Sequence, residues 1–140
     1  MADSLSAAIK SAGAGLSAQS TRMQIISENL ANANAIASRA GGDPYARKLV
    51  SFEAMLDEAS GAETVTVGPI SRDRAPFRTE LDPGNPAADE KGIVKLPNVN
   101  PLVELADMRE ANRSYQANLQ VVRQARDLIS MTLDLLKVTT

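Results

Sequence analysis

The 140-residue sequence contains no cysteine and no histidine. These two absences exclude disulfides, thiol chemistry, the usual zinc sites and every catalytic triad that depends on an imidazole. Aromatic residues are also scarce, at 3% of the chain, although 44% of the residues are hydrophobic. Because large aromatic side chains usually anchor globular cores, this scarcity favours thin seams between helices over one thick core.

Charge of neither sign is concentrated in the sequence: 15 basic and 17 acidic residues are mixed along it, for a formal net charge of −2. No segment is basic enough to neutralise a phosphate backbone, so nucleic acid is not an expected partner. Residues 1–19 show no basic leader followed by an apolar run, and no stretch is apolar enough to span a membrane. We therefore expect a cytoplasmic protein, or one exported by a route without a cleaved leader.

Residues 1–37 are predicted to form the first of two long helices. Apolar or small side chains recur at steps of three and four, which places them on one helix face. The stripe, broken only by its one polar member, consists of Ile9, Ala12, Leu16, Gln19, Met23, Ile26, Leu30, Ala33 and Ala37. Asp3 or Ser4 is expected to cap the start of this helix, and Asn32 or Asn34 to end it in a left-handed conformation.

Residues 98–140 are predicted to form the second helix, with Asn98 or Asn100 as its cap and Pro101 in its first turn. No glycine or proline follows Pro101, so the helix is expected to run to about Lys137, roughly 55 Å at 1.5 Å per residue. The same three–four rhythm, with polar interruptions at Asn112 and Arg126, is followed by Leu105, Met108, Tyr115, Leu119, Val122, Ile129, Leu133 and Leu136.

Residues 38–97 differ in composition from the two predicted helices, because they are rich in glycine and proline. A short apolar-patterned piece lies around residues 49–56, and strands are predicted at Thr64–Val67 and, after a turn, at Ile93–Leu96. Ile70–Leu81 is expected to be extended and interrupted by Pro76. The predicted fold is mainly α, with long N- and C-terminal helices paired as a coiled coil around a small β-rich or irregular insert.

The two striped helices predict an assembly protein, because each helix covers only one face of the other. The predicted assembly seam consists of Leu16, Met23, Ile26, Leu30, Leu105, Met108, Tyr115, Leu119, Val122, Ile129, Leu133 and Leu136. Neighbouring subunits are expected to cover the remaining apolar and small residues, namely Ile25, Ala31, Ala33, Ala111, Ala117, Val121, Leu128, Met131 and Leu135. The alternative is an ordinary helical hairpin that serves as a groove for one soluble partner.

The residues give little support to a catalytic or metal-binding role. Counting from Asp82, the third, fifth and twelfth positions lack the ligands of a calcium-binding loop. The carboxylates that could carry out acid–base catalysis in an enzyme are Glu80, Asp82, Asp89 and Glu90. A basic cluster beside Phe77, formed by Arg72, Arg74 and Arg78, either binds an anionic polymer or is neutralised by Asp73 and Glu80. We predict no enzyme, no metal, no cofactor and no small-molecule substrate.

Four runs of the sequence resemble a known family. Residues 17–33, which contain Ser27-Glu28-Asn29-Leu30, resemble the N-terminal motif of the flagellar axial proteins of the rod and hook. Residues 82–92, 96–101 and 110–118 are similar to the proximal-rod members of that family. The resemblance implies terminal helices paired as a coiled coil within a helical tube that crosses the periplasm, with the insert outside.

The same resemblance implies a set of partners. They are copies of the chain, other rod proteins, the basal-body ring, the base of the export gate, and the flagellar type III apparatus, which exports such chains unfolded. The implied role is to transmit torque and to carry later subunits outward.

Overall fold

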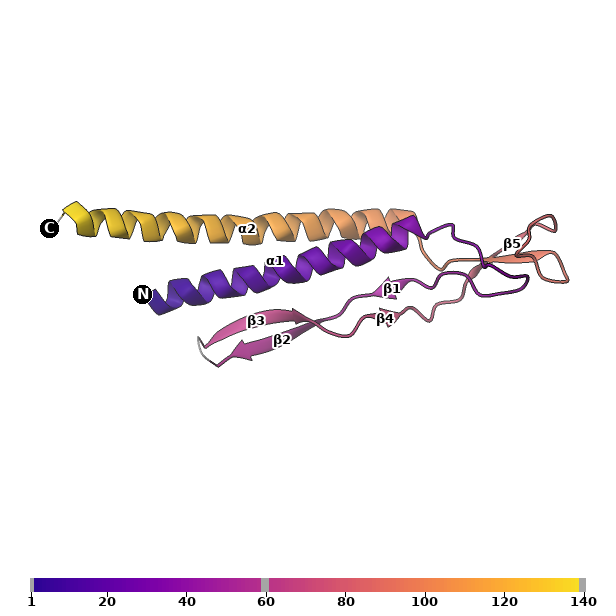
Figure 1. The fold of residues 1–140 in the computed structure, drawn as a ribbon, viewed down its shortest axis with the longest axis horizontal. Helices are drawn as coiled ribbons and strands as arrows, with labels where there is room; N and C mark the ends of the chain where they lie inside the picture. Colours follow the sequence, from indigo (N-terminus) through magenta and orange to yellow (C-terminus); the bar gives the residue numbers. More distant parts are fainter. Residues whose placement is uncertain (1, 59–60, 139–140) are drawn as a thin grey trace. The chain divides into compact units, whose positions relative to one another are not determined.

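The computed structural model describes residues 2–58 and 61–138 (Figure 1). In chain order its elements are α1 (Ala2–Ala31), β1 (Lys48–Leu49), β2 (Phe52–Asp57), β3 (Ala62–Val67), β4 (Ser71–Arg72), β5 (Arg78–Leu81), β6 (Ile93–Leu96) and α2 (Pro101–Val138). Two long terminal helices therefore flank a small insert that contains strands, as predicted. The strands pair antiparallel in twos: β1 with β4, β2 with β3, and β5 with β6.

The chain divides into two compact units, and each long helix contributes to both. The first unit comprises residues 1–21, 52–68 and 110–140, and the second comprises residues 22–51 and 69–109. Each unit thus combines part of α1, part of the insert and part of α2.

In the first unit the β2–β3 hairpin is attached to α1 by polar contacts. Lys10 Nζ lies 2.9 Å from Asp57 Oδ2, and the Ser11 hydroxyl donates to the Glu63 carbonyl at 3.0 Å. The two helices approach closely here, because a Cβ atom at Gly15 would lie 2.6 Å from Asn118 Nδ2. Glycine at this position therefore leaves room for the neighbouring helix.

The second unit holds the most deeply buried part of the insert. Val94 and Val99 are 2% and 1% exposed, and Pro97 between them is also fully buried. Arg78 donates to the carbonyl oxygens of Pro97 and Ala33, which ties β5 to both β6 and the chain that leaves α1. Arg78 therefore links this buried segment to the residues that follow α1.

The ends of the helices confirm some predictions and correct others. Asn100 caps α2, because its Oδ1 accepts from the Leu102 amide at 3.0 Å and its carbonyl accepts from the Glu104 amide at 3.1 Å. The α1 helix begins at Ala2, so the prediction of a cap at Asp3 or Ser4 was wrong; the Asp3 side chain lies outside the described part of the chain.

The predicted left-handed end of α1 was also wrong. Among the described residues only glycines have positive φ, so neither Asn32 nor Asn34 is left-handed. Instead the backbone N–H and side-chain Nδ2 of Asn32 both donate to the Glu28 carbonyl, at 3.1 and 2.8 Å. The side chain satisfies an end-of-helix carbonyl without a change in the hand of the backbone.

The strand predictions were largely confirmed. Residues 64–67 lie within β3 and residues 93–96 form β6, while the extended piece from 70 to 81 is broken into β4 and β5. The turn before β6 is held by Asp89, whose Oδ1 accepts from the amides of Lys91 and Ile93 at 2.8 and 2.9 Å. This turn is therefore self-contained.

Replacing Gly92 with alanine is expected to lower the free energy of unfolding by about 1–2 kcal/mol. Gly92 has a φ of +76°, and an added Cβ would lie 2.9 Å from the Cγ of Pro83. A matched control is Gly13→Ala in α1, where an added Cβ meets nothing within 4 Å. Helix propensity predicts that the control gains up to about 1 kcal/mol. Urea unfolding of both variants measures the difference, and an equal effect of the two substitutions would contradict this explanation.

Candidate assembly interface

The buried face of α1 is narrower and less apolar than its predicted stripe. Its buried members are Ala12, Gly15, Ala18, Ile25, Ile26 and Asn29, and Ala33, which follows the helix, is also buried. Of the predicted seam residues on this helix, Ile26 is buried, whereas Leu16, Met23 and Leu30 are only half-buried. Gly15 leaves room for the Asn118 side chain of α2.

On α2 the buried face is rotated by one residue relative to the predicted stripe. Glu104, Ala111 and Ala125 are buried, whereas the residues that follow them, Leu105, Asn112 and Arg126, are exposed. Asn112 and Arg126 therefore do not interrupt the face that is buried within the chain. On α2 the periodicity predicts large apolar side chains at the buried positions, but two of the three buried residues are alanines.

The predicted seam residues of α2 fall into two groups. Those of its middle part, Met108, Tyr115, Leu119 and Val122, are half-buried within the chain. Those at its two ends, Leu105, Ile129, Leu133 and Leu136, are exposed. Their role as an assembly seam stays a prediction.

Three of the residues expected to contact neighbouring subunits are buried within the chain itself. Ile25, Ala33 and Ala111 are 6%, 3% and 0% exposed, so their assignment to neighbours was wrong. Ile25 and Ala111 lie on the buried faces of α1 and α2, which the apolar periodicity did not locate, and Ala33 follows the end of α1. Ala31 and Ala117 are exposed and stay available.

Exposed apolar residues are concentrated on α2. The large apolar side chains of α2 that are exposed in the single chain are Leu102, Val103, Leu105, Val121, Leu128, Ile129, Met131, Leu133, Leu135 and Leu136. Leu128, Ile129 and Leu133 also line an open apolar groove of about 610 Å³, opposite Leu5 and Ala8 of α1. An apolar surface of this extent usually marks an interaction site.

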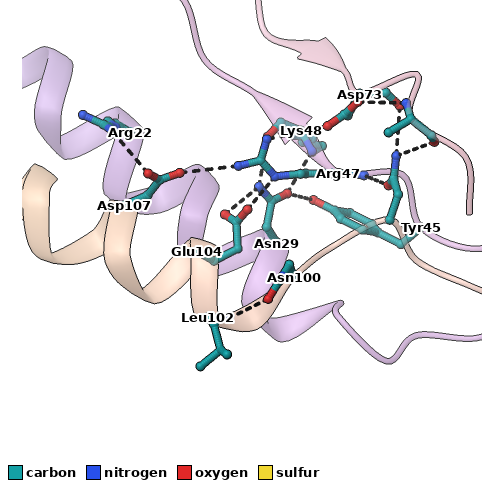
Figure 2. Close-up of polar contacts among 12 residues, drawn as sticks. Arg22, Asn29, Tyr45, Arg47, Lys48, Asp73, Asn100, Leu102, Glu104 and Asp107 are labelled. Carbon is teal, nitrogen blue, oxygen red and sulfur yellow. Dashed lines mark hydrogen bonds and ion pairs between the residues drawn. The ribbon is translucent and has the colours of Figure 1, made fainter. Parts of the chain in front are cut away.

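A buried polar cluster forms where α1, α2 and the insert meet in the second unit (Figure 2). The Glu104 cluster consists of Asn29, Tyr45, Arg47, Lys48 and Glu104. Asn29 is 1% exposed, and its side chain pairs with both backbone groups of Lys48: Nδ2 donates to the carbonyl and Oδ1 accepts from the amide, each at 2.9 Å. The Tyr45 hydroxyl donates to the same Oδ1 at 2.8 Å.

Glu104 is the acidic centre of this cluster and is 0% exposed. Its Oε1 accepts from Arg47 Nε at 2.5 Å, and its Oε2 accepts from Asn29 Nδ2 at 3.1 Å. Arg47 also lies near Asp107 on α2 and Asp73 after β4, at 3.4 and 3.7 Å (Figure 2). Both carboxylate oxygens are therefore satisfied, as a buried charge requires.

Burial beside acidic groups also affects Tyr45. Its loss of contact with water raises the pKa of the Tyr45 hydroxyl, and the charges of Glu28 and Glu104 raise that pKa further. The hydroxyl therefore stays protonated and serves as a hydrogen-bond donor to Asn29.

Apolar periodicity missed the Glu104 cluster altogether. One signal was present in the sequence: on α2 the residues at intervals of seven from Glu104 are Ala111, Asn118 and Ala125, which are small or polar. A heptad line of this kind indicates close helix packing with a polar position that fixes alignment. The partner Arg47 lies 57 positions away in the insert and had no local signature.

The carboxylates considered for chemistry, Glu80, Asp82, Asp89 and Glu90, lie in β5 and in the connection between β5 and β6. Hydrogen bonds from the amides of Ile93 and Lys91 hold the pKa of the Asp89 carboxyl below its ordinary value, which disfavours Asp89 as a proton donor. Glu80, Asp82 and Glu90 are exposed. Of the basic cluster, Arg78 is occupied by carbonyl oxygens rather than by Asp73 or Glu80.

Two general properties complete the description. Across residues 2–58 and 61–138, no group of three or more acidic side chains is placed to hold a metal ion. In the same part of the chain, neither long helix is apolar enough over sufficient length to cross a membrane.

Comparison with known proteins gives matches at both ends and over the full length. Residues 9–35 match the family described as "Flagella basal body rod protein", and residues 90–135 match "Flagellar basal body rod FlgEFG protein C-terminal". A relative from Agrobacterium fabrum (strain C58), named flagellar basal-body rod protein FlgC, is 60% identical over 137 residues, which is 98% of this chain and 99% of the relative.

More distant relatives carry the same name. Proteins from Escherichia coli O6:H1 and Salmonella typhimurium (strain LT2), both named flagellar basal-body rod protein FlgC, are each 40% identical over 126 residues. In both cases the match covers 89% of this chain and 92% of the relative. The chain therefore belongs to the FlgC family of flagellar basal-body rod proteins.

Proposed function

We propose that this chain is a structural subunit of the flagellar basal-body rod, in its proximal part, and that it assembles with copies of itself and with other rod proteins. The observation that carries the proposal is the 60% identity, over nearly the full length of both chains, to a protein named for the rod. FlgC proteins are structural components of the basal body, and this role accounts for a chain built around two long helices.

The exposed apolar residues of α2 support assembly over a monomeric function. Leu128, Met131 and Leu135 are 54%, 62% and 70% exposed in the single chain. Each large apolar side chain gains about 1.5–3 kcal/mol when a neighbour removes it from water. Neighbouring subunits that cover these residues would therefore stabilise the rod, because the same apolar contacts recur in every subunit.

The arrangement of the helices supports coiled-coil packing in the rod. In the first unit Gly15 of α1 faces Asn118 of α2, and in the second unit Asn29 of α1 contacts Glu104 of α2. Small and polar residues at heptad spacing are typical of such seams. We infer that residues 1–37 and 98–140 form the coiled-coil core and that residues 38–97 form the outer layer.

Rod geometry follows from the kind of contact that the helices offer. A surface on one subunit that binds a different surface on the next is heterologous, and repeated heterologous contacts that do not close generate a helical tube. Such a tube transmits torque through its many seams, and its lumen carries exported subunits. The basal-body ring and the base of the export gate are proposed neighbours at its inner end.

The proposed location is the periplasmic rod, reached through the flagellar type III apparatus. Deletion of the gene should abolish swimming, and a tagged copy that restores swimming should be recovered in purified basal bodies. A protein that stays in the cytoplasm as a stable monomer or dimer would instead support a soluble adaptor role. Fractionation of complemented cells distinguishes the two outcomes.

A further inference from the structure

Residues 45–48 are the part of the insert that leads into β1, yet little β structure holds them in place. The adjoining strand β1 is two residues long and pairs only with β4, also two residues long. A two-stranded ladder of this length contributes little stability by itself. The placement of this segment therefore depends on its other contacts.

Those contacts come from both helices at once. From α1, Asn29 pairs with the amide and carbonyl of Lys48 and accepts from the Tyr45 hydroxyl, and the Glu28 carboxylate lies against Lys48 Nζ. From α2, Glu104 accepts from Arg47 Nε, and Asp107 adds a second carboxylate at 3.4 Å. Each helix therefore supplies a buried polar partner to the same four residues.

The two helices also depend on each other at this point. Asn29 Nδ2 donates to Glu104 Oε2 at 3.1 Å as well as to the Lys48 carbonyl. If either helix moved away, the other would keep a buried polar group without its partner, and such a group is costly. If residues 45–48 detached from the helices, Asn29 and Glu104 would likewise lose hydrogen-bond partners.

We propose that Asn29 and Glu104 are positioning residues that form a joint docking site for residues 45–48, so that the insert is anchored only when α1 and α2 are paired in one alignment. This inference goes beyond the proposed rod role, because it concerns how a single chain couples its helices to its insert. It assigns to Glu104 a function that apolar packing of the helices does not require.

Alignment matters because the neighbouring seam is permissive. Along α2 the buried residues after Glu104 are alanines at 111 and 125, which pack against many surfaces with little preference for one axial position. A single buried polar position in a helix seam is a known way to fix alignment. Only one placement of the two helices brings both Asn29 and Glu104 to Arg47 and Lys48.

Amide hydrogen exchange on the purified full-length chain tests the proposal. The reporters are the Lys48 amide, which donates to Asn29 Oδ1, and the Asp73 amide, which donates to the Arg47 carbonyl at 2.7 Å. Neither reporter is bonded to Glu104. Glu104→Leu is expected to raise the exchange rates of both amides at least tenfold more than Val94→Ala does. The rates are compared under conditions in which the two variants are equally stable. Val94 is 2% exposed and belongs to β6 in the same unit, so it controls for general loss of stability.

The reciprocal variant completes the test. Arg47→Met should speed exchange at the Glu104 amide in the first turn of α2 and at the Asn32 amide at the end of α1, because coupling between sites is mutual. If Glu104→Leu does not fold, Tyr45→Phe removes one bond to Asn29 and should raise Lys48 exchange severalfold. Unchanged Lys48 exchange in the Glu104 or Tyr45 variants, or an unprotected Lys48 amide in the unaltered chain, would overturn the proposal.

Discussion

Aspartate at both Leu128 and Met131 is expected to abolish rod assembly and swimming while the purified chain stays folded. These side chains are three residues apart on α2 and are 54% and 62% exposed, so a single chain does not need them. Exposed substitutions change stability by about 0.5 kcal/mol or less. In the rod, each copy would instead lose about 3–6 kcal/mol of apolar burial and gain two charges to desolvate.

Soft-agar motility and yield of basal bodies measure the first effect, and circular dichroism of the purified variant measures the second. Gln124→Asp is the matched control, because Gln124 is exposed on the same helix and the substitution adds charge without removing an apolar group. Normal swimming of the double variant would show that neighbours do not cover this surface. Aspartate at Ile26 or Leu119 should also block assembly, but Ile26 is buried and Leu119 half-buried, so those variants also disturb the single chain.

Glu104→Ala is expected to lower the free energy of unfolding by about 3–5 kcal/mol, the usual cost of breaking a buried ion pair. The substitution leaves the Arg47 guanidinium, whose side chain is 19% exposed, without its 2.5 Å partner, and leaves Asn29 with one acceptor fewer. Because a domain of this size is stable by only about 5–15 kcal/mol, motility should fall strongly as well.

A double-mutant cycle with Arg47→Ala separates the pair from its surroundings. If the ion pair is the main contact of both residues, the double variant should lose at least about 1 kcal/mol less than the sum of the single variants. Glu90→Ala is the control, since Glu90 is exposed in the turn before β6. Additive losses would show that Glu104 and Arg47 act independently, and a Glu104 variant as stable as the control would show that the cluster contributes little.

Much of the fold was predictable because its helices have strong local signals. Heptad-like spacing located α1 and α2, Pro101 after Asn98 or Asn100 indicated where α2 starts, and alternating Thr64-Val65-Thr66-Val67 located β3. These features depend on residues that are close in the sequence. The family resemblance likewise came from contiguous motifs, and the relatives confirmed it.

The buried face and the polar cluster were not predictable in the same way. Periodicity of apolar residues assumes that the largest ones face the partner, whereas here Gly15 lies close to Asn118 of α2 and Ala111 is completely buried. Glu104 has no local signature of its pairing in the sequence, because its partners, Asn29 and Arg47, lie 75 and 57 positions away. Pairing over that separation is a property of the folded chain.

The central claim is that the exposed apolar residues of α2 contact neighbouring subunits in the rod. Cryo-electron microscopy of purified basal bodies at side-chain resolution tests it most directly. We predict that Leu128, Met131 and Leu135 of each copy lie against helices of another subunit, while Glu104 keeps its contact with Arg47 of its own chain. A rod in which these three side chains face open solvent or the lumen would contradict the account.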